Sequence, residues 1–277
     1  MYRLLALDID GTLVNSNNEL TPATIAALRR AADAGLRIVL ATGRRYSRAL
    51  PLAEPLGIDA PIISASGALI KRPHDHSTIH CASFPRDVLC TMLGVVEQAG
   101  YDAILYGDTY GQGYDYYCRT VQVEHPELAE YLALNPNCEC IRPELVRDPP
   151  EGVFAGFVMG SREQMQALHQ ALDRKLPDAL YTHVIRSPRY RGFMCEIAPV
   201  GETKWSGIHR LALDWDIAPD EICAVGDDVN DLPMVTAAGL GIAMGNAAPE
   251  LKAAADRIAP AHDDDGLVTV VEWLLDE

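Results

Sequence analysis

Basic residues are scarce in this sequence relative to acidic ones. Its 277 residues include 23 Lys and Arg against 39 Asp and Glu, which gives a formal net charge of −16. A surface that acidic repels nucleic acid and anionic membranes, so general polyanion binding is excluded as a function. A small anionic substrate is compatible with this charge if cations gather locally at the site that binds it.

Long apolar runs are absent as well. No stretch reaches the roughly 20 apolar residues of a membrane-spanning helix, and the N-terminus has no charged segment followed by an apolar one. The seven cysteines are odd in number and scattered, mostly in apolar segments, as Cys90, Cys195 and Cys223 are. This pattern favours reduced thiols in the core over a disulfide framework. We therefore expect a cytoplasmic protein with neither nucleic acid nor membrane as a partner.

Short apolar runs alternate with helical segments at both ends of the chain. Residues 3–9, 36–41, 61–64 and 222–225 are continuous apolar stretches, typical of parallel strands buried on both faces of a sheet. Helix-start residues predict helices over residues 22–34, 44–56 and 268–275, and others that begin near Trp205, Val229 and Pro249. The alternation predicts an α/β fold with a doubly wound, Rossmann-like parallel sheet.

The alternation is interrupted in the middle of the chain. A helix is predicted over residues 85–99, a tyrosine-rich, turn-rich stretch follows over 101–117, and a strand–helix pair covers 153–176. This order of elements indicates a separate α+β unit inserted into the α/β fold. We therefore expect two domains, a core of residues 1–83 and 192–277 and an inserted domain of residues 84–191.

Polar clusters directly follow the first two predicted strands. Asp8 and Asp10 end the first strand on one side of an extended chain, and Gly11 then permits a sharp turn. Thr42 and Gly43 end the second strand at the start of a helix, where free amides and a hydroxyl can bind a phosphate. Both clusters also have structural explanations, because acid–glycine loops often follow strands and a threonine can simply cap its helix.

A third polar cluster follows the strand at 222–225. Asp227, Asp228, Asn230 and Asp231 lie within five positions. The repulsion among these acids would be costly without a cation, so a hard divalent ion is the natural partner, and helix capping explains only one or two of them. The carboxyl ends of parallel strands meet at one edge of a sheet, so all three clusters are expected to lie together.

The clusters match a known set of motifs. The runs 8–12, 42–44 and 226–231, together with Lys204, resemble the four ordered motifs of the haloacid dehalogenase-like (HAD) superfamily, and more narrowly of its Cof-type phosphatases. The run 241–266 is similar to the C-terminal pattern of that subfamily. The place of the insertion, between the second and third motifs, resembles that of the subfamily's large α/β cap. On its own, Lys204 would be interpreted as a surface lysine.

The resemblance implies a Mg²⁺-dependent phosphatase that hydrolyses a small phosphorylated metabolite through an aspartyl-phosphate. It makes Asp8 the nucleophile, Asp10 the general acid and base, and the Asp8 and Asp227 side chains and the Asp10 carbonyl the metal ligands. The other roles that it implies are phosphate binding by Ile9, Thr42, Gly43, Lys204 and Asn230, with Thr42 and Lys204 also catalytic, and orientation of the metal site by Asp228 and Asp231.

Two positions depart from the usual pattern of the subfamily. Ser66 stands where an asparagine is common, and Trp205 stands where a glycine commonly follows the lysine. Neither change removes a reacting group, so both bear on substrate fit. Arg44, Arg45 and Ser66 are the residues expected to contact substrate in the core.

The inserted domain holds two groups with an open interpretation. The tyrosines over 101–117 either pack the sheet of that domain or contact a sugar or aromatic leaving group. Arg186, Arg189 and Arg191 are either solvated or bind a carboxylate or second phosphate of the substrate.

Other functions use the same residues. A phosphotransferase or phosphomutase would form the same aspartyl-phosphate and pass it to another acceptor, and a non-catalytic module would only bind metal and phosphate. The presence of both Asp8 and Asp10 argues against the module, and dehalogenases do not need the second acid. Sugar phosphates, flavin mononucleotide and pyridoxal phosphate all stay open as substrates, as does the oligomeric state.

Overall fold

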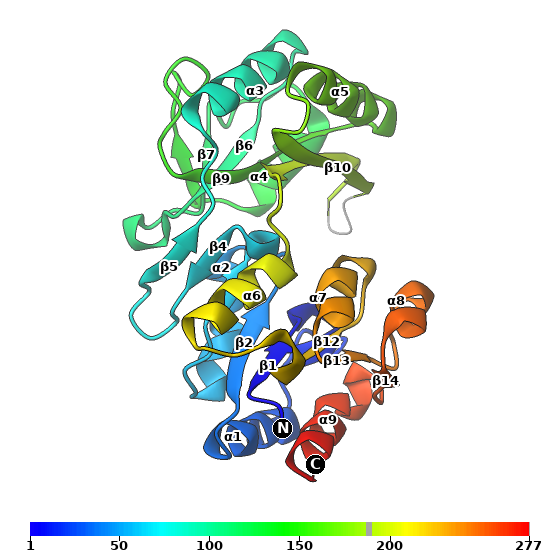
Figure 1. Cartoon of the computed structure of the whole chain (residues 1–277). Helices are drawn as coiled ribbons and strands as arrows, with labels where there is room; N and C mark the ends of the chain where they lie inside the picture. The colour runs from blue at the N-terminus through cyan, green and yellow to red at the C-terminus, as the bar shows by residue number, and fades with distance from the viewer. Residues whose placement is uncertain (187–189, 277) are drawn as a thin grey trace. The chain divides into compact units, whose positions relative to one another are not determined.

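The structure, a computed structural model, describes residues 1–186 and 190–276 (Figure 1). Its chain forms two compact units. The first unit combines Met1–His80 with Glu202–Glu277, and the second unit is Cys81–Gly201. Arg189, one of the three arginines singled out above, lies outside the described residues.

The first unit is built on an eight-stranded sheet in the order β14-β13-β12-β1-β2-β3-β4-β5. Its six parallel strands are β1 (Leu4–Leu7), β2 (Arg37–Ala41), β3 (Ile62–Ser64), β12 (Ile222–Gly226), β13 (Leu240–Ala243) and β14 (Arg257–Ile258). β4 (Leu69–Lys71) runs antiparallel to β3, and β5 (Thr78–Cys81) pairs with β4 at the edge. Every residue of β1 is fully buried, as expected for a parallel strand covered on both faces.

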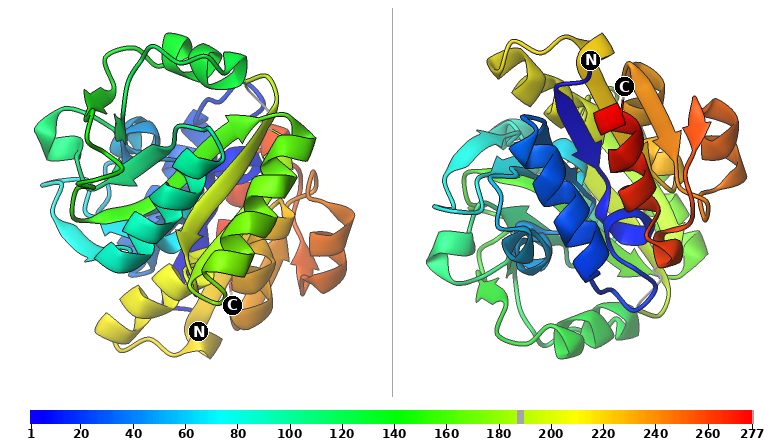
Figure 2. Two further views of the ribbon diagram at one scale, coloured as in Figure 1. Left: turned by 90° about the horizontal axis from the view of Figure 1, so that it is seen from above. Right: turned by 90° about the horizontal axis from the view of Figure 1, so that it is seen from below.

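Helices cover both faces of this sheet. The helices are α1 (Pro22–Asp33), α2 (Tyr46–Ala53), α6 (Lys204–Asp214), α7 (Leu232–Ala237), α8 (Pro249–Ala254) and α9 (Gly266–Asp276). Apolar residues of α6, α7 and α8 pack with Leu4, Ala6 and Val39 in one core cluster. α1 and α9 contact each other and lie side by side on the opposite face (Figure 2, right). The predicted doubly wound α/β fold is confirmed.

The polypeptide leaves the first unit and returns to it at neighbouring points. His80, its last residue before the second unit, has Nε2 3.6 Å from Oε1 of Glu202, the first residue after that unit. Both side chains are mostly buried. The two connections to the second unit therefore start from neighbouring points.

The second unit is an α+β fold with a six-stranded sheet in the order β10-β11-β9-β6-β7-β8. The strands are β6 (Ile104–Gly107), β7 (Tyr116–Cys118), β8 (Glu139–Ile141), β9 (Val153–Gly160), β10 (Leu180–Arg186) and β11 (Phe193–Pro199). α3 (Arg86–Gln98) and α5 (Arg162–Lys175) share one core cluster, and α4 (Pro126–Leu134) belongs to the other. Tyr116 and Tyr117 in the tyrosine-rich stretch are buried in these clusters.

The second unit extends further along the chain than the predicted insertion of residues 84–191. β11 pairs with β10 over its whole length and with β9 from Phe193 to Ile197, so the polypeptide rejoins the first unit only after Gly201. The apolar pattern of β11 resembles that of the core strands, and only its pairing shows to which sheet it belongs. Among the described residues, no helix combines the length and the apolar character that crossing a membrane requires.

Candidate functional site

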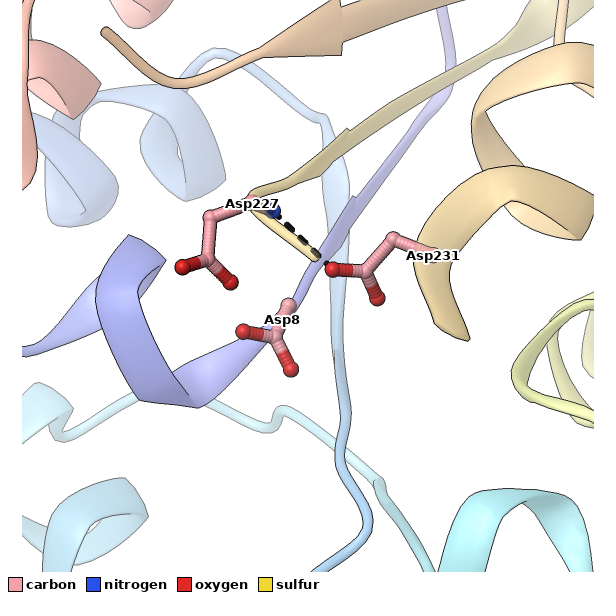
Figure 3. Close-up of side chains that lie close together, drawn as sticks. All are labelled: Asp8, Asp227 and Asp231. Atoms are coloured by element: carbon pink, nitrogen blue, oxygen red, sulfur yellow. Dashed lines mark hydrogen bonds between the residues drawn. The ribbon is translucent and has the colours of Figure 1, made fainter. Parts of the chain in front are cut away.

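Asp8 and Asp227 follow neighbouring strands of the first unit. β1 and β12 are parallel, with Leu7 opposite Val225, so the residues after them emerge at the same edge of the sheet. One carboxylate oxygen each from Asp8, Asp227 and Asp231 lie within 4.8 Å of one another (Figure 3). We call these three residues the acidic cluster. Such a cluster of oxygen donors could hold a metal ion.

Lys204 is the cation of this cluster. It is the first residue of α6, and Thr203 caps that helix by accepting a hydrogen bond from the Ser206 N–H. Its Nζ lies 2.6 Å from Asp8 Oδ1 and 2.7 Å from Asp231 Oδ1. Only 2% of Lys204 is exposed, so it is no surface lysine.

Asp231 organises the loop around the acidic cluster. Its Oδ1 accepts from Lys204, and its Oδ2 accepts from the backbone N–H groups of Asp227 and Asp228, at 2.9 and 3.1 Å. Asp228 instead caps the short turn η6 (Val229–Asp231), because its Oδ1 accepts from the Val229 N–H. The capping alternative therefore accounts for Asp228, while Asp231 connects the lysine to the loop that carries Asp227.

Burial and mutual repulsion disfavour the charged form of Asp8 and Asp227 and raise the pKa values of both. Burial raises the pKa of Asp8, and the neighbouring carboxylates add to the rise while Lys204 opposes it. Burial together with Asp231 and Asp228 raises the pKa of Asp227 to about 7. Burial alone would lower the pKa of Lys204, but Asp8 and Asp231 outweigh it and raise that pKa. One ammonium thus faces three carboxylates, and the cluster is short of positive charge.

The turn after Asp8 approaches Asp227 closely. Gly11 has a φ of +72°, and a Cβ at this position would lie 2.0 Å from Asp227 Oδ2, so only glycine fits here. Asn246 bridges the same two residues, because its Nδ2 donates to the Gly11 carbonyl at 2.8 Å and to Asp227 Oδ2 at 3.4 Å. No role was predicted for Asn246 from the sequence. Its position shortly after β13, at the same edge of the sheet, could have indicated that it belongs to the site.

Thr42 and Ser66 follow the next two strands of the sheet, β2 and β3. Thr42 is fully buried, and its Oγ1 accepts from the Arg44 N–H at 3.1 Å, which leaves its hydroxyl proton available. The Ser66 N–H donates to the Thr42 carbonyl, and Ser66 Oγ would be 3.5 Å from a Cβ on Gly43. Ser66 has a φ of +55°, a conformation that asparagine adopts more readily than serine does. This backbone therefore also suits the asparagine that the resemblance leads us to expect at this position.

Asp10 differs from Asp8 in its surroundings. Its side chain is 61% exposed, and it forms an ion pair with Arg44. Arg44, predicted as a substrate contact, thus binds a residue of the site itself, while Arg45 is the residue preceding α2.

The remaining predicted residues lie around the acidic cluster. Asn230 Oδ1 lies 3.5 Å from Lys204 Nζ, and Ile9 is fully buried directly after Asp8. Trp205 packs against the core cluster of the first unit, and its ring stacks on His209. The bulk of Trp205 is therefore accommodated in the packing of α6.

Comparisons with known proteins show the family to which the chain belongs. The family model described as haloacid dehalogenase-like hydrolase matches residues 5–271. The chain is 27% identical to phosphatase YwpJ of Bacillus subtilis, over 99% of this chain and 100% of that protein. It is 26% identical to the 5-amino-6-(5-phospho-D-ribitylamino)uracil phosphatase YitU of the same organism, over 95% of this chain and 94% of that protein.

A solved structure is similar over nearly the whole chain. The crystal structure of a haloacid dehalogenase-like hydrolase from Bacteroides thetaiotaomicron is 27% identical and has a TM-score of 0.81, covering 99% of this chain and 100% of that one. The chain belongs to the haloacid dehalogenase-like hydrolase family, as the four motifs predicted. It is an enzyme of that class.

Proposed function

We propose that this enzyme is a Mg²⁺-dependent phosphatase that hydrolyses a small phosphomonoester, such as a sugar phosphate, through an aspartyl-phosphate on Asp8. One observation carries the proposal. Asp8 is a buried carboxylate at the end of β1, 2.6 Å from the Lys204 ammonium and beside Asp227. A nucleophile that attacks a phosphate dianion needs such positive charge close by.

The residues present fit a magnesium ion. Among the described residues, Asp8 Oδ2 and Asp227 Oδ1 accept no hydrogen bond, and the cluster is short of positive charge. We propose that Asp8, Asp227 and the backbone carbonyl of Asp10 hold Mg²⁺, with Asp231 orienting the loop. When bound, the ion supplies positive charge that offsets the repulsion between carboxylates and substrate phosphate.

The chain's own residues account for both half-reactions. In the first, an Asp8 oxygen forms a bond to phosphorus, and the ester P–O bond breaks with its electron pair on the leaving oxygen, which takes a proton from the Asp10 carboxyl. In the second, the Asp10 carboxylate accepts a proton from water as the water oxygen bonds to phosphorus. The bond from phosphorus to Asp8 then breaks, and inorganic phosphate is released.

Donors around Asp8 are suited to hold the transferring phosphoryl group. Lys204 contributes a fixed charge, and Thr42 contributes a buried hydroxyl whose proton is available. The amides of Ile9 and Gly43 and the side chain of Asn230 complete the proposed set. Because these groups are held by the sheet edge, they need little rearrangement when charge develops on the phosphoryl oxygens.

The other assignments are proposals of the same kind. The first unit would carry the chemistry and the second unit the selection of substrate, with Arg45 and Ser66 as contacts in the first unit. Cytoplasmic location is supported by the cysteines, since all seven lie among the described residues and are free thiols.

A substrate panel tests this function. Phosphorylated sugars, nucleotides and pyridoxal phosphate are incubated with enzyme and Mg²⁺, with and without chelator, and free phosphate is measured. We expect hydrolysis of at least one ester, lost on chelation and restored by Mg²⁺. A product phosphorylated on an added alcohol or sugar would instead indicate a phosphotransferase. Tight binding of an ester without turnover would indicate a non-catalytic module.

Asp227→Asn is expected to stabilise the metal-free protein and to abolish its stabilisation by Mg²⁺. A carboxyl whose pKa rises on folding from 3.8 to about 7 costs stability as the pH increases across that interval. The melting temperature of the variant should exceed that of wild type at pH 8 without metal, by about 2–4 °C for each kcal/mol gained, and the difference should shrink at acidic pH. Added Mg²⁺ should raise the melting temperature of wild type only. An equal Mg²⁺ effect on both proteins would show that Asp227 is no ligand.

A further inference from the structure

The exposed carboxylate of Asp10 is held by a single guanidinium. Arg44 Nε lies 2.8 Å from Asp10 Oδ2, and Arg44 Nη2 lies 2.5 Å from Asp10 Oδ1. Nη2 also donates to the side-chain oxygen of Asn18. A two-point pair between guanidinium and carboxylate is charge-assisted and fixes the direction as well as the distance of its partner.

Arg44 is itself held in place. Its N–H donates to Thr42 Oγ1, and its carbonyl accepts from the Ala65 N–H at 3.0 Å. Only 22% of its side chain is exposed. A residue fixed to the ends of β2 and β3 thus orients a carboxylate from the loop after β1. Among the described residues, no other hydrogen bond orients the Asp10 carboxylate.

The position of Asp10 suits contact with a leaving group. Asp8 is buried, and so are Lys204 and Asp231, the residues of its ion-paired group, so we take the leaving oxygen of an ester bound there to lie on the outer, more exposed side. Asp10 is two residues away and exposed, so it lies on that outer side. A carboxyl in this place can exchange protons with a leaving oxygen only if its orientation is controlled.

We propose that Arg44 is a positioning residue that acts through Asp10 and thereby equips the enzyme for esters of poorly departing alcohols, the class to which sugar phosphates belong. This inference rests on the proposed function. An ester with a good leaving group, such as p-nitrophenyl phosphate, needs little proton donation to its leaving oxygen, whereas an alkyl phosphate depends on it. Loss of Arg44 therefore slows the first half-reaction of the two kinds of ester unequally.

The test compares Arg44→Ala with wild type on p-nitrophenyl phosphate and on the sugar phosphate that wild type hydrolyses fastest. The two esters are compared by the rate of alcohol release in a single turnover, which measures the first half-reaction alone, because the second half-reaction uses Asp10 as a base whatever the ester. We expect this rate for the sugar phosphate to fall at least about 10²-fold. For p-nitrophenyl phosphate the burst of p-nitrophenol should stay within about threefold of wild type, while its steady-state kcat falls because the second half-reaction is slowed. Asp10→Asn should show the same contrast, and the double variant should be no slower than Asp10→Asn alone, because both changes remove one function. Arg30→Ala, which removes the same charge from the exposed surface of α1, should change neither rate.

Several results would overturn the proposal. Equal losses in the single-turnover rate of alcohol release from both esters, or a raised KM with unchanged kcat, would make Arg44 a phosphate-binding or structural residue. Additive losses in the double variant would show that it acts independently of Asp10. Arg44→Gln replaces the alanine variant if circular dichroism shows that the latter is unfolded. A wild-type enzyme that hydrolyses neither ester in Mg²⁺ would overturn the proposed function itself, whereas hydrolysis of p-nitrophenyl phosphate alone would overturn only the substrate class.

Discussion

Asp8→Asn is expected to abolish turnover while the fold stays intact. The asparagine amide has the shape of the carboxylate but is a far weaker nucleophile, so kcat should fall on the order of 10⁴-fold or more. The variant also removes one of three crowded acids, and Lys204 keeps its bond to Asp231. Its melting temperature at neutral pH without metal should therefore not fall below that of wild type. Phosphate release and thermal unfolding measure the two effects.

A matched control separates chemistry from net charge. Asp33→Asn makes the same substitution at the exposed end of α1, and its activity should equal that of wild type. Acid-quenched wild type should carry a phosphoryl group on Asp8 by mass spectrometry, and the Asp8→Asn variant should carry none. Retention of more than a few per cent of wild-type activity by Asp8→Asn would exclude Asp8 as the nucleophile.

Lys204→Met is expected to lower both activity and stability. The substitution leaves Asp8 and Asp231 buried side by side without their counter-charge, and breaking a buried ion pair in this way costs about 3–5 kcal/mol. The loss should be greater at alkaline than at acidic pH, because without the ammonium the pKa of Asp8 rises further above its usual value and its burial costs stability over a wider pH range. Urea denaturation at pH 8 and at pH 5 measures the difference.

A second substitution tests whether the cost arises from the unpaired acids. Adding Asp231→Asn to Lys204→Met removes one of the two carboxylates left without a partner. The double variant should be more stable at pH 8 than Lys204→Met alone, although still inactive. If the double variant were less stable by the sum of the two single effects, the lysine would stabilise the fold through packing instead of charge.

Much of the site could be predicted because its acids follow strands. The carboxyl ends of parallel strands lie at one edge of the sheet, so the strand pattern alone predicted that Asp8 and Asp227 lie close together. Lys204 begins a helix and has no local signal of burial, and only the resemblance assigned it to the site. Its environment depends on where α6 packs, which is a property of the whole first unit.

Contacts between separate loops were not predicted. The pairing of Asp10 with Arg44 depends on side-chain conformations at the ends of two strands, which no sequence period encodes. The same limit applies to Asn246, whose partners lie on two other loops. The end of the insertion was placed too early because an apolar strand such as β11 fits either sheet until its partners are known.

The closeness of His80 and Glu202 has a consequence for how this family can evolve. The inserted segment begins and ends at neighbouring points of the first unit, so its removal or replacement leaves no wide gap for a new connection to span. Recombination could exchange whole inserts at this junction while every strand that supports Asp8 and Asp227 is kept. New specificities could thus arise by swapping a module, without redesign of the reacting groups.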